Sequence, residues 1–230
     1  MYANLHQAYS DPTEVRENFN YNPKKILYIH IPKTGGTSVE DSFLKAGISV
    51  GRFAQKPKKL ENTSKVKCSY WHIPPKYLDL DFTNHITLTI IRKPFPRFFS
   101  EHNWQMRARR RKQVEDIDSW AIHIFNDSKK KYDFLDCHSL PQSEYLFDKN
   151  NKMVPNIIRL EYLEEDFAKF KKKYNLPNIQ MLHSNRSDLK VVNGVRTMSK
   201  KTEAMVKDFY KKDFELFEKM GWYTKEELEL

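Results

Sequence analysis

Hydrophobic and polar positions along the chain repeat with two different periods. Residues 26–31 and 85–91 are short, almost unbroken runs of β-branched and other apolar residues, which predict buried strands. Between them, apolar residues from Val39 onward recur at helical spacing in a segment that should end near Gly47. A strand, a helix and a second strand joined at this length predict two parallel strands, and therefore an α/β fold.

The rest of the chain continues this mixture. Residues 154–160 predict a third strand, and 199–220 the strongest helix, because its large apolar residues recur at roughly helical spacing. Other elements are expected at 66–70 (a short strand), 95–107, 120–125 and 162–174 (helices), and 178–195 (a loop or lid). We expect a polar arm over 1–24 and a single three-layer α/β domain over 25–230, with a central, mainly parallel sheet flanked by helices.

The composition is that of a globular protein with a basic, strongly solvated surface. Hydrophobic residues make up 39% of the 230 residues and charged residues 30%, with a mean hydropathy of −0.77. This hydrophobic content excludes a disordered chain. The net charge of +10 comes from 40 Lys and Arg against 30 Asp and Glu. Such a field favours anionic partners, namely nucleotides, sulfated or carboxylated glycans, nucleic acid or acidic lipid, without choosing among them.

Cysteine content and apolar segments bear on where the protein works. Cys68 and Cys137 are too few for a disulfide framework or a metal site, and their spacing does not decide whether they pair. Residues 1–20 contain no apolar signal segment, and no run approaches the about 18 apolar residues of a membrane span. The chain as given therefore predicts a cytoplasmic location without a membrane anchor.

A glycine turn follows the first strand and precedes the first helix. After Pro32, which ends the strand, the turn consists of Lys33, Thr34, Gly35, Gly36, Thr37 and Ser38. Adjacent glycines let backbone N–H groups converge, and the helix N-terminus adds further donors and a positive dipole end, so a phosphate is the expected ligand. Lys33 adds a formal charge, and Thr37 and Ser38 either cap the helix or donate hydroxyl hydrogen bonds. The turn is not a nucleoside-triphosphate loop, because that motif requires G-K-[ST].

A second anion site is expected after the second strand. Arg92 lies at the carboxyl end of a parallel strand, where open α/β sheets bind ligands. Ser100 follows eight residues later, about a turn into the predicted helix. The planar guanidinium of Arg92 matches phosphate oxygens bidentately, so that Arg92 and Ser100 could share one phosphate.

The two segments together resemble the phosphate-binding motifs of sulfotransferases that use 3′-phosphoadenosine 5′-phosphosulfate (PAPS). H-I-P-K-T-G-G-T-S resembles the 5′-phosphosulfate loop of the carbohydrate branch that contains the heparan sulfate 2-O-sulfotransferases, and I-R-x-P-x-x-R-x-x-S from Ile91 resembles its 3′-phosphate motif. Y-x-x-D-F-x-x-F from Tyr210 is a fainter match. The resemblance implies a P-loop-like fold and PAPS as cofactor, with 3′-phosphoadenosine 5′-phosphate (PAP) as product. The cofactor-binding residues would be Lys33, Thr34, Gly35, Gly36, Thr37, Ser38, Arg92 and Ser100.

The resemblance also implies a mechanism of in-line transfer to an acceptor hydroxyl. Lys33 would stabilise the charge that develops on the bridging oxygen as the sulfuryl group leaves. His72, in a proline-bent loop between the two motifs, matches the region of the family's catalytic histidine and is the expected base, although Tyr70 replaces the other histidine often found there. The acceptor is expected to be a carbohydrate, and an acidic one would suit the basic segments 56–67 and 107–112.

Of the other histidines, His30 is expected to be structural, and His102, His138 and His183 are alternative candidates for the site. No cluster has metal-ligand spacing, and the transfer requires no metal. Nucleic acid is not expected as a partner, and nothing predicts the oligomeric state.

Two other functions are compatible with a basic chain carrying a glycine turn. An atypical P-loop kinase or NTPase would consume ATP with Mg²⁺, but the chain lacks the standard lysine. A non-catalytic basic module would bind glycans or nucleic acid with a steep dependence on salt and no need for a nucleotide.

Overall fold

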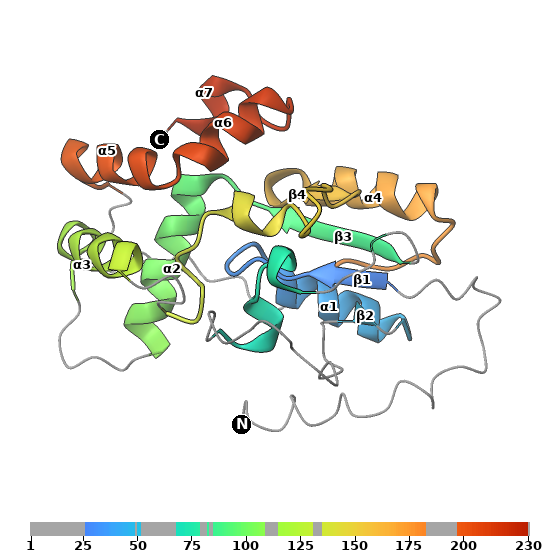
Figure 1. The fold of residues 1–230 in the computed structure, drawn as a ribbon. Helices are drawn as coiled ribbons and strands as arrows, with labels where there is room; N and C mark the ends of the chain where they lie inside the picture. The colour runs from blue at the N-terminus through green and yellow to red at the C-terminus, as the bar shows by residue number, and fades with distance from the viewer. Residues whose placement is uncertain are drawn as a thin grey trace.

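A four-stranded, all-parallel sheet forms the centre of the fold (Figure 1). The structure is a computed structural model that describes residues 26–48, 50–51, 68–78, 82, 85–108, 115–130, 135–182 and 197–229. The strands, in the spatial order β2-β1-β3-β4, are β1 (Ile26–Ile29), β2 (Val50–Gly51), β3 (Ile86–Ile91) and β4 (Ile157–Arg159). Ile26 pairs with Ile86, and Thr89 pairs with Ile157, so all the strands end at the same edge.

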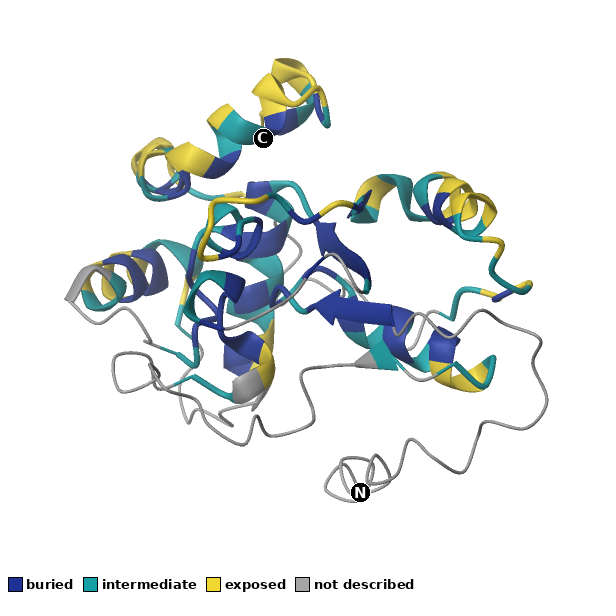
Figure 2. Ribbon diagram, turned by 45° about the vertical axis from the view of Figure 1, so that its right-hand side comes forward, coloured by how far each residue is buried: buried dark blue, intermediate teal, exposed yellow. Residues whose placement is uncertain are grey.

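Helices α1 (Gly36–Lys45) and α4 (Leu163–Lys173) cover one face of the sheet. Alternate strand residues such as Ile26 and Tyr28 pack there against Phe43 of α1 and Phe167 of α4. The two central strands, β1 and β3, are buried along their whole length, as expected for parallel strands covered on both faces (Figure 2).

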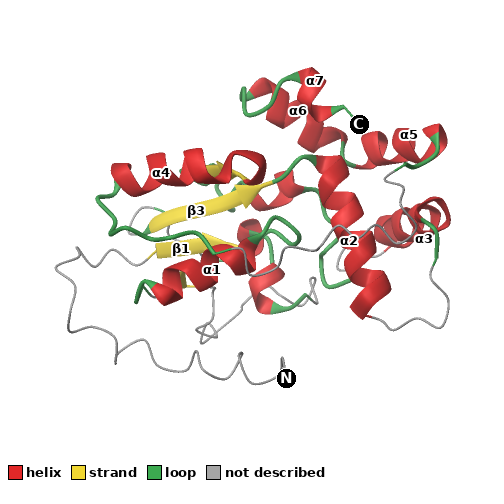
Figure 3. Cartoon of the chain, turned by 180° about the vertical axis from the view of Figure 1, so that it is seen from behind, coloured by secondary structure: helices red, strands yellow, loops and turns green. Residues whose placement is uncertain are grey.

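The opposite face is covered mainly by short 3-10 turns and by the C-terminal helices. These elements are η2 (Tyr70–His72), η3 (Pro75–Tyr77), η4 (Gln142–Tyr145), α6 (Lys211–Lys219) and α7 (Lys225–Leu228). Leu27 and Ile29 pack there with Tyr145 of η4 and Phe217 of α6. A third cluster joins α2 (Pro94–Ala108), α3 (Ile117–Lys130) and α5 (Lys200–Phe209) beyond the end of β3, where Figure 3 shows the β3 arrowhead pointing toward α2.

The predicted fold class is confirmed, because β1 and β3 are parallel neighbours separated by α1 and the sheet is flanked by helices. The elements that were not predicted include β2, the 3-10 turns η3 and η4, the 3-10 turn η5 (Leu160–Tyr162) after β4, and α7. The expected strand at 66–70 is wrong at Tyr70, which begins a 3-10 turn, and its first two residues lie outside the described residues. The arm at 1–24, the basic segments at 56–67 and 109–112, and most of the expected loop at 178–195 also lie outside them.

The expected single helix at 199–220 is wrong, because it is divided into α5 and α6 at Tyr210 (Figure 3). Tyr210 has φ −98° and ψ 20°, outside the helical range. Val206 packs with α2 and α3, whereas Phe217 packs on the sheet face. The chain leaves the helical conformation at Tyr210, and the segments before and after it pack on these two different clusters.

Candidate active site

The turn between β1 and α1 has the backbone geometry that its glycines predict. Lys33 and Gly35 have left-handed φ angles of 68° and 85°, and Gly35 is the N-cap of α1. A Cβ atom added to Gly36 would lie 2.8 Å from the His30 ring and 2.8 Å from the Tyr28 hydroxyl. Gly35 therefore supplies the conformation, and Gly36 lets the start of α1 approach β1 closely.

The hydroxyl groups of the turn differ in their roles. The buried Thr34 hydroxyl donates to the Ile31 carbonyl at 2.9 Å, so it braces the turn. Thr37 and Ser38 lie inside α1 and do not cap it, because the N-cap is Gly35 and no side chain caps this end. Capping by Thr37 or Ser38 is thus excluded, and donation of their hydroxyl hydrogen bonds to a ligand stays a prediction.

Arg92 directly follows β3 and lies beside the turn. Its guanidinium Nη1 donates to the Lys33 carbonyl at 3.3 Å, so the structure brings these two predicted site residues together. The Gln142 side chain holds the Arg92 backbone by accepting from its N–H at 2.9 Å and donating to its carbonyl at 2.7 Å. Ser100 lies partly buried in α2, and its sharing of a phosphate with Arg92 stays a prediction.

The Lys33 ammonium group lies in a partly buried, electropositive position. Its Nζ is 5.3 Å from the ring centroid of Trp104, which is 43% exposed. Burial lowers the pKa of Lys33 to about 8; the Glu101 carboxylate opposes this shift, and nearby arginines, Arg92 first, add to it. A dianionic ligand at this position would favour the charged form.

Two histidines lie against each other near this turn, and each is paired with a carboxylate. The Nδ1 atom of His72 is 2.7 Å from Asp136 Oδ2, and that of His138 is 2.8 Å from Glu101 Oε2. The two rings are 4.6 Å apart at an angle of 87°. We call these four residues the paired-histidine cluster. Trp104 joins it to Lys33, because its ring stacks on His138 at 4.8 Å.

Both carboxylates of the cluster are held in their ionised forms. Burial raises the pKa of Glu101, but the contacts with His138 and Gln105 outweigh it and hold that pKa below its ordinary value. Burial also raises the pKa of Asp136, but hydrogen bonds from His72 and from the Ser69 N–H outweigh burial and hold that pKa below its ordinary value. An ionised carboxylate accepts a hydrogen bond from Nδ1–H, which leaves Nε2 as the nitrogen with a lone pair in each neutral ring.

The cluster also contains a group that could ligate a metal ion. Ligand atoms of His72, Asp136 and His138 all lie within 4.8 Å of one another, and imidazole with carboxylate suits zinc. The sequence does not show this group, because His72 and Asp136 are 64 residues apart. Both oxygens of Asp136 already accept hydrogen bonds, so the contacts present are those of a hydrogen-bonded pair.

Of the other histidines, His30 lies 5.3 Å from the His72 ring and contacts Glu40 at 3.3 Å, so it adjoins the cluster from β1. His102 instead packs against Trp120 and its Nε2 contacts the Glu115 carbonyl. His183 lies outside the described residues.

Buried Arg97 fastens the glycine turn to the segment that carries His138. Its guanidinium donates to the carbonyls of Pro32 at 3.0 Å, Leu140 at 2.9 Å and His138 at 2.8 Å. The residue is 3% exposed. Arg97 is the second arginine of I-R-x-P-x-x-R-x-x-S, so the motif held a signal for it, and its role is to position the site.

The C-terminal pattern supports the same segment. The Tyr210 hydroxyl donates to the Ser139 carbonyl at 3.1 Å. The fully buried Asp213 carboxylate accepts from the N–H groups of Gln142 and Ser143, both at 2.7 Å. Because Gln142 holds the Arg92 backbone, the conformation at Arg92 depends on a residue about 120 positions later.

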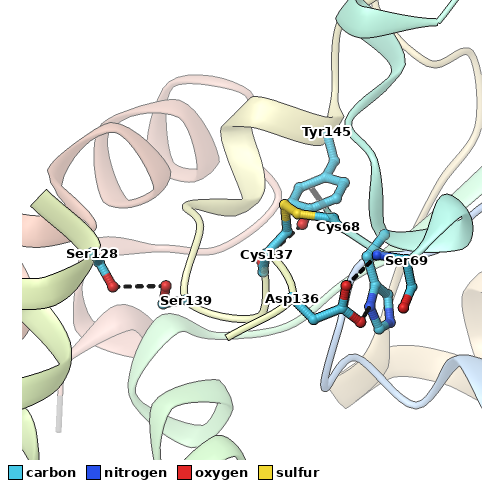
Figure 4. The surroundings of a disulfide bond; sticks show 8 residues. Cys68, Ser69, Ser128, Asp136, Cys137, Ser139 and Tyr145 are labelled. Atoms are coloured by element: carbon cyan, nitrogen blue, oxygen red, sulfur yellow. Dashed lines mark hydrogen bonds and ion pairs between the residues drawn. A yellow bond between two sulfur atoms is a disulfide. The ribbon is translucent and has the colours of Figure 1, made fainter. Parts of the chain in front are cut away.

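Cys68 and Cys137 form a disulfide, which answers the question that their spacing left open (Figure 4). It joins the segment that contains His72 to the segment that contains Asp136 and His138. The Tyr145 hydroxyl donates to the Cys137 carbonyl at 2.9 Å beside it.

A sequence model of the sulfotransferase family matches residues 17–220, which is most of the chain. The protein therefore belongs to the sulfotransferase family, and its activity is the transfer of a sulfuryl group to an acceptor hydroxyl. No curated protein and no solved structure matches the chain. Across the described ranges, every helix is too short or too polar to cross a lipid bilayer.

Proposed function

We propose that the protein transfers the sulfuryl group of PAPS to a carbohydrate hydroxyl, with Lys33 and His72 as catalytic residues. The observation that carries the proposal is the contact between Arg92 and the Lys33 carbonyl, which joins the two phosphate-binding motifs at one edge of the sheet. Carboxyl ends of adjacent parallel strands are where such sheets bind nucleotides.

The chemistry of the donor groups fits a doubly phosphorylated nucleotide. The edge presents the Lys33 ammonium, the Arg92 guanidinium and the first N–H groups of α1, all of which are hydrogen-bond donors or cations. Gly36, Thr37 and Ser38 would hold the 5′-phosphate from the start of α1, and Arg92 with Ser100 would hold the 3′-phosphate. Lys33 lies within the field of Arg92, as its lowered pKa indicates, so a phosphate there would relieve the repulsion between two cations.

The bound donor would supply the sulfuryl group and a phosphate leaving group. Lys33 would donate a hydrogen bond to the oxygen on which negative charge develops, and a partly desolvated ammonium does this more strongly than a hydrated one. His72 would accept the proton of the acceptor hydroxyl at Nε2, because its Nδ1 faces the Asp136 carboxylate. Arg97 and Gln142 would hold these groups in register.

The carbohydrate acceptor is supported by the resemblance to the 2-O-sulfotransferase branch and by the net charge of +10. A kinase or a purely binding module would leave the family match and the joined phosphate motifs unexplained. The Cys68–Cys137 disulfide favours an oxidising compartment over the cytoplasmic location expected from the sequence, because disulfides persist mainly in oxidising compartments.

The donor is tested by calorimetry with PAP and with AMP, which differ only in the 3′-phosphate. We expect PAP to bind about 30- to 100-fold more tightly, since charge-assisted hydrogen bonds contribute about 1.5–3 kcal/mol each. Arg92→Ala should lower the affinity for PAP to nearly that for AMP and leave the affinity for AMP unchanged. Equal affinity for PAP and AMP in the wild-type protein would overturn the assignment of PAPS.

The catalytic groups are tested by turnover with PAPS and a panel of desulfated glycans. Lys33→Ala and His72→Ala should abolish turnover while the protein stays folded, and His72→Ala should still bind PAP. His138→Ala is the matched control for a neighbouring imidazole that also has a carboxylate partner. Turnover that survives His72→Ala but not His138→Ala would move the base to His138.

A further inference from the structure

Three consecutive residues beside the cluster adopt a backbone conformation that is unfavourable for them. Leu135, Asp136 and Cys137 have φ angles of 51°, 56° and 64°. The left-handed region is unfavourable for a residue with a side chain, because the Cβ atom comes too close to the following carbonyl oxygen. Such a run persists only where the surrounding structure determines it, and it is found mostly at functional sites.

The surroundings of this turn show what holds it. Cys137 is fully buried and is bonded to Cys68. Its carbonyl accepts from Tyr145, and the His138 N–H closes the turn onto the Leu135 carbonyl at 3.1 Å. The disulfide is the covalent member of this set.

Asp136 spans the same two segments without a covalent bond. One carboxylate oxygen accepts from the Ser69 N–H, next to Cys68 (Figure 4). The other oxygen contacts His72 Nδ1 at 2.7 Å. Three links therefore join residues 68–72 to residues 136–137: the disulfide and the two contacts of one carboxylate.

We infer that Asp136 is the positioning residue of His72 and that the Cys68–Cys137 disulfide holds it there, so that full turnover requires the oxidised protein. The inference rests on the proposed function of His72 as the base. Asp136 keeps the Nδ1 proton in place and aims Nε2 at the acceptor hydroxyl, as the aspartate of a catalytic triad does for its histidine. Without the disulfide, the left-handed turn is free to relax, and the carboxylate leaves the imidazole.

The redox step is an ordinary exchange with a dithiol. One thiolate of the dithiol attacks the sulfur of Cys68, which is the less buried partner, and releases Cys137 as a thiolate. The second thiol of the reagent then attacks the reagent sulfur of this mixed disulfide and releases Cys68. The products are two cysteine thiols and one cyclic disulfide, so two electrons pass from the dithiol to the protein. Dithiothreitol serves as the probe, and removal of the reagent in air or with oxidised glutathione reverses the change.

The test compares oxidised and reduced wild-type protein with Asp136→Asn, which keeps the disulfide. Reduction should lower kcat about 10- to 100-fold, since misplacement of a catalytic group by about 1 Å has an effect of this size. The affinity for PAP, measured by calorimetry on the same samples, should be unchanged. Asp136→Asn should lower kcat by a similar factor, and reduction should then lower it by less than about threefold further, because both changes remove one interaction. Asp136→Glu should recover part of the loss.

Three results would overturn the inference. Reduced wild-type protein that keeps its kcat would show that the disulfide does not hold Asp136 against His72. An equal effect of reduction on Asp136→Asn and on wild type would show that the disulfide acts through a residue other than Asp136. Parallel loss of PAP affinity on reduction would assign the disulfide to the fold as a whole. If His72→Ala itself keeps full turnover, the assignment of His72 as the base is wrong, and the positioning role of Asp136 is wrong with it.

Discussion

The lowered pKa of Lys33 makes donor binding depend on pH in a predictable direction. In the free protein, burial lowers this pKa from 10.5 to about 8, so the side chain is half neutral near pH 8. A phosphate beside the ammonium group favours its charged form and returns the pKa toward 10.5. Binding of PAP at pH 8 should therefore take up about half a proton from solution.

The size of the effect follows from the protonated fraction. With a pKa of about 8, roughly nine-tenths of the free protein carries the charge at pH 7 and about one-tenth at pH 9. If the bound form stays charged throughout, the affinity for PAP should fall about tenfold between pH 7 and pH 9, which corresponds to about 1.4 kcal/mol. Because the pKa of the free group is the lower one, affinity falls as pH rises.

Calorimetry at pH 7, 8 and 9, with two buffers of different ionisation enthalpy at pH 8, measures both quantities. Lys33→Arg is the matched control, because arginine stays charged throughout this range and removes the pH dependence that belongs to residue 33. A wild-type affinity that stays constant from pH 7 to pH 9, or one that falls equally in Lys33→Arg, would refute this account of Lys33.

Three further outcomes test other parts of the structure. Gly36→Ala should lower the free energy of unfolding by about 1–3 kcal/mol, since the new methyl group meets the His30 ring. Gly221→Ala, in open space, should lower it by only about 1 kcal/mol, because its backbone is left-handed. Thermal unfolding compares the two variants, and equal losses would argue against the close contact at Gly36. Arg97→Met should cost about 3–5 kcal/mol in urea denaturation, because three buried carbonyls lose their donor, while exposed Arg107→Met should stay within about 0.5 kcal/mol. A chelator should leave turnover unchanged, and a loss that zinc restores would show that the paired-histidine cluster ligates a metal.

The parts of the fold that depend on local pattern could be predicted from the sequence. The β-branched runs gave β1 and β3, and the glycines after Pro32 gave the turn before α1. The proximity of Lys33 and Arg92 follows from the same reasoning, because each lies beyond the carboxyl end of one of two adjacent parallel strands. These features need no knowledge of distant packing.

The second half of the site depends on contacts that no local pattern encodes. Asp136 and His138 reach His72 from more than 60 positions away, on a turn whose left-handed residues carry no glycine to announce it. In the sequence Glu101 looks like any charged residue of a helix, and only the folded structure shows that its buried carboxylate contacts His138. The predicted helix at 199–220 is divided at Tyr210 because α5 and α6 pack on different clusters, and the apolar spacing alone does not show this.

The hold of Asp213 on Gln142 has a consequence for biosynthesis. A nascent polypeptide that has just passed residue 200 already contains Lys33, His72 and Arg92, yet the carboxylate that fixes the Gln142 backbone has not been translated. The contacts that hold the candidate site are therefore complete only when the final helices have left the ribosome, and we expect a chain that ends before Asp213 to be inactive however much of the sheet it contains.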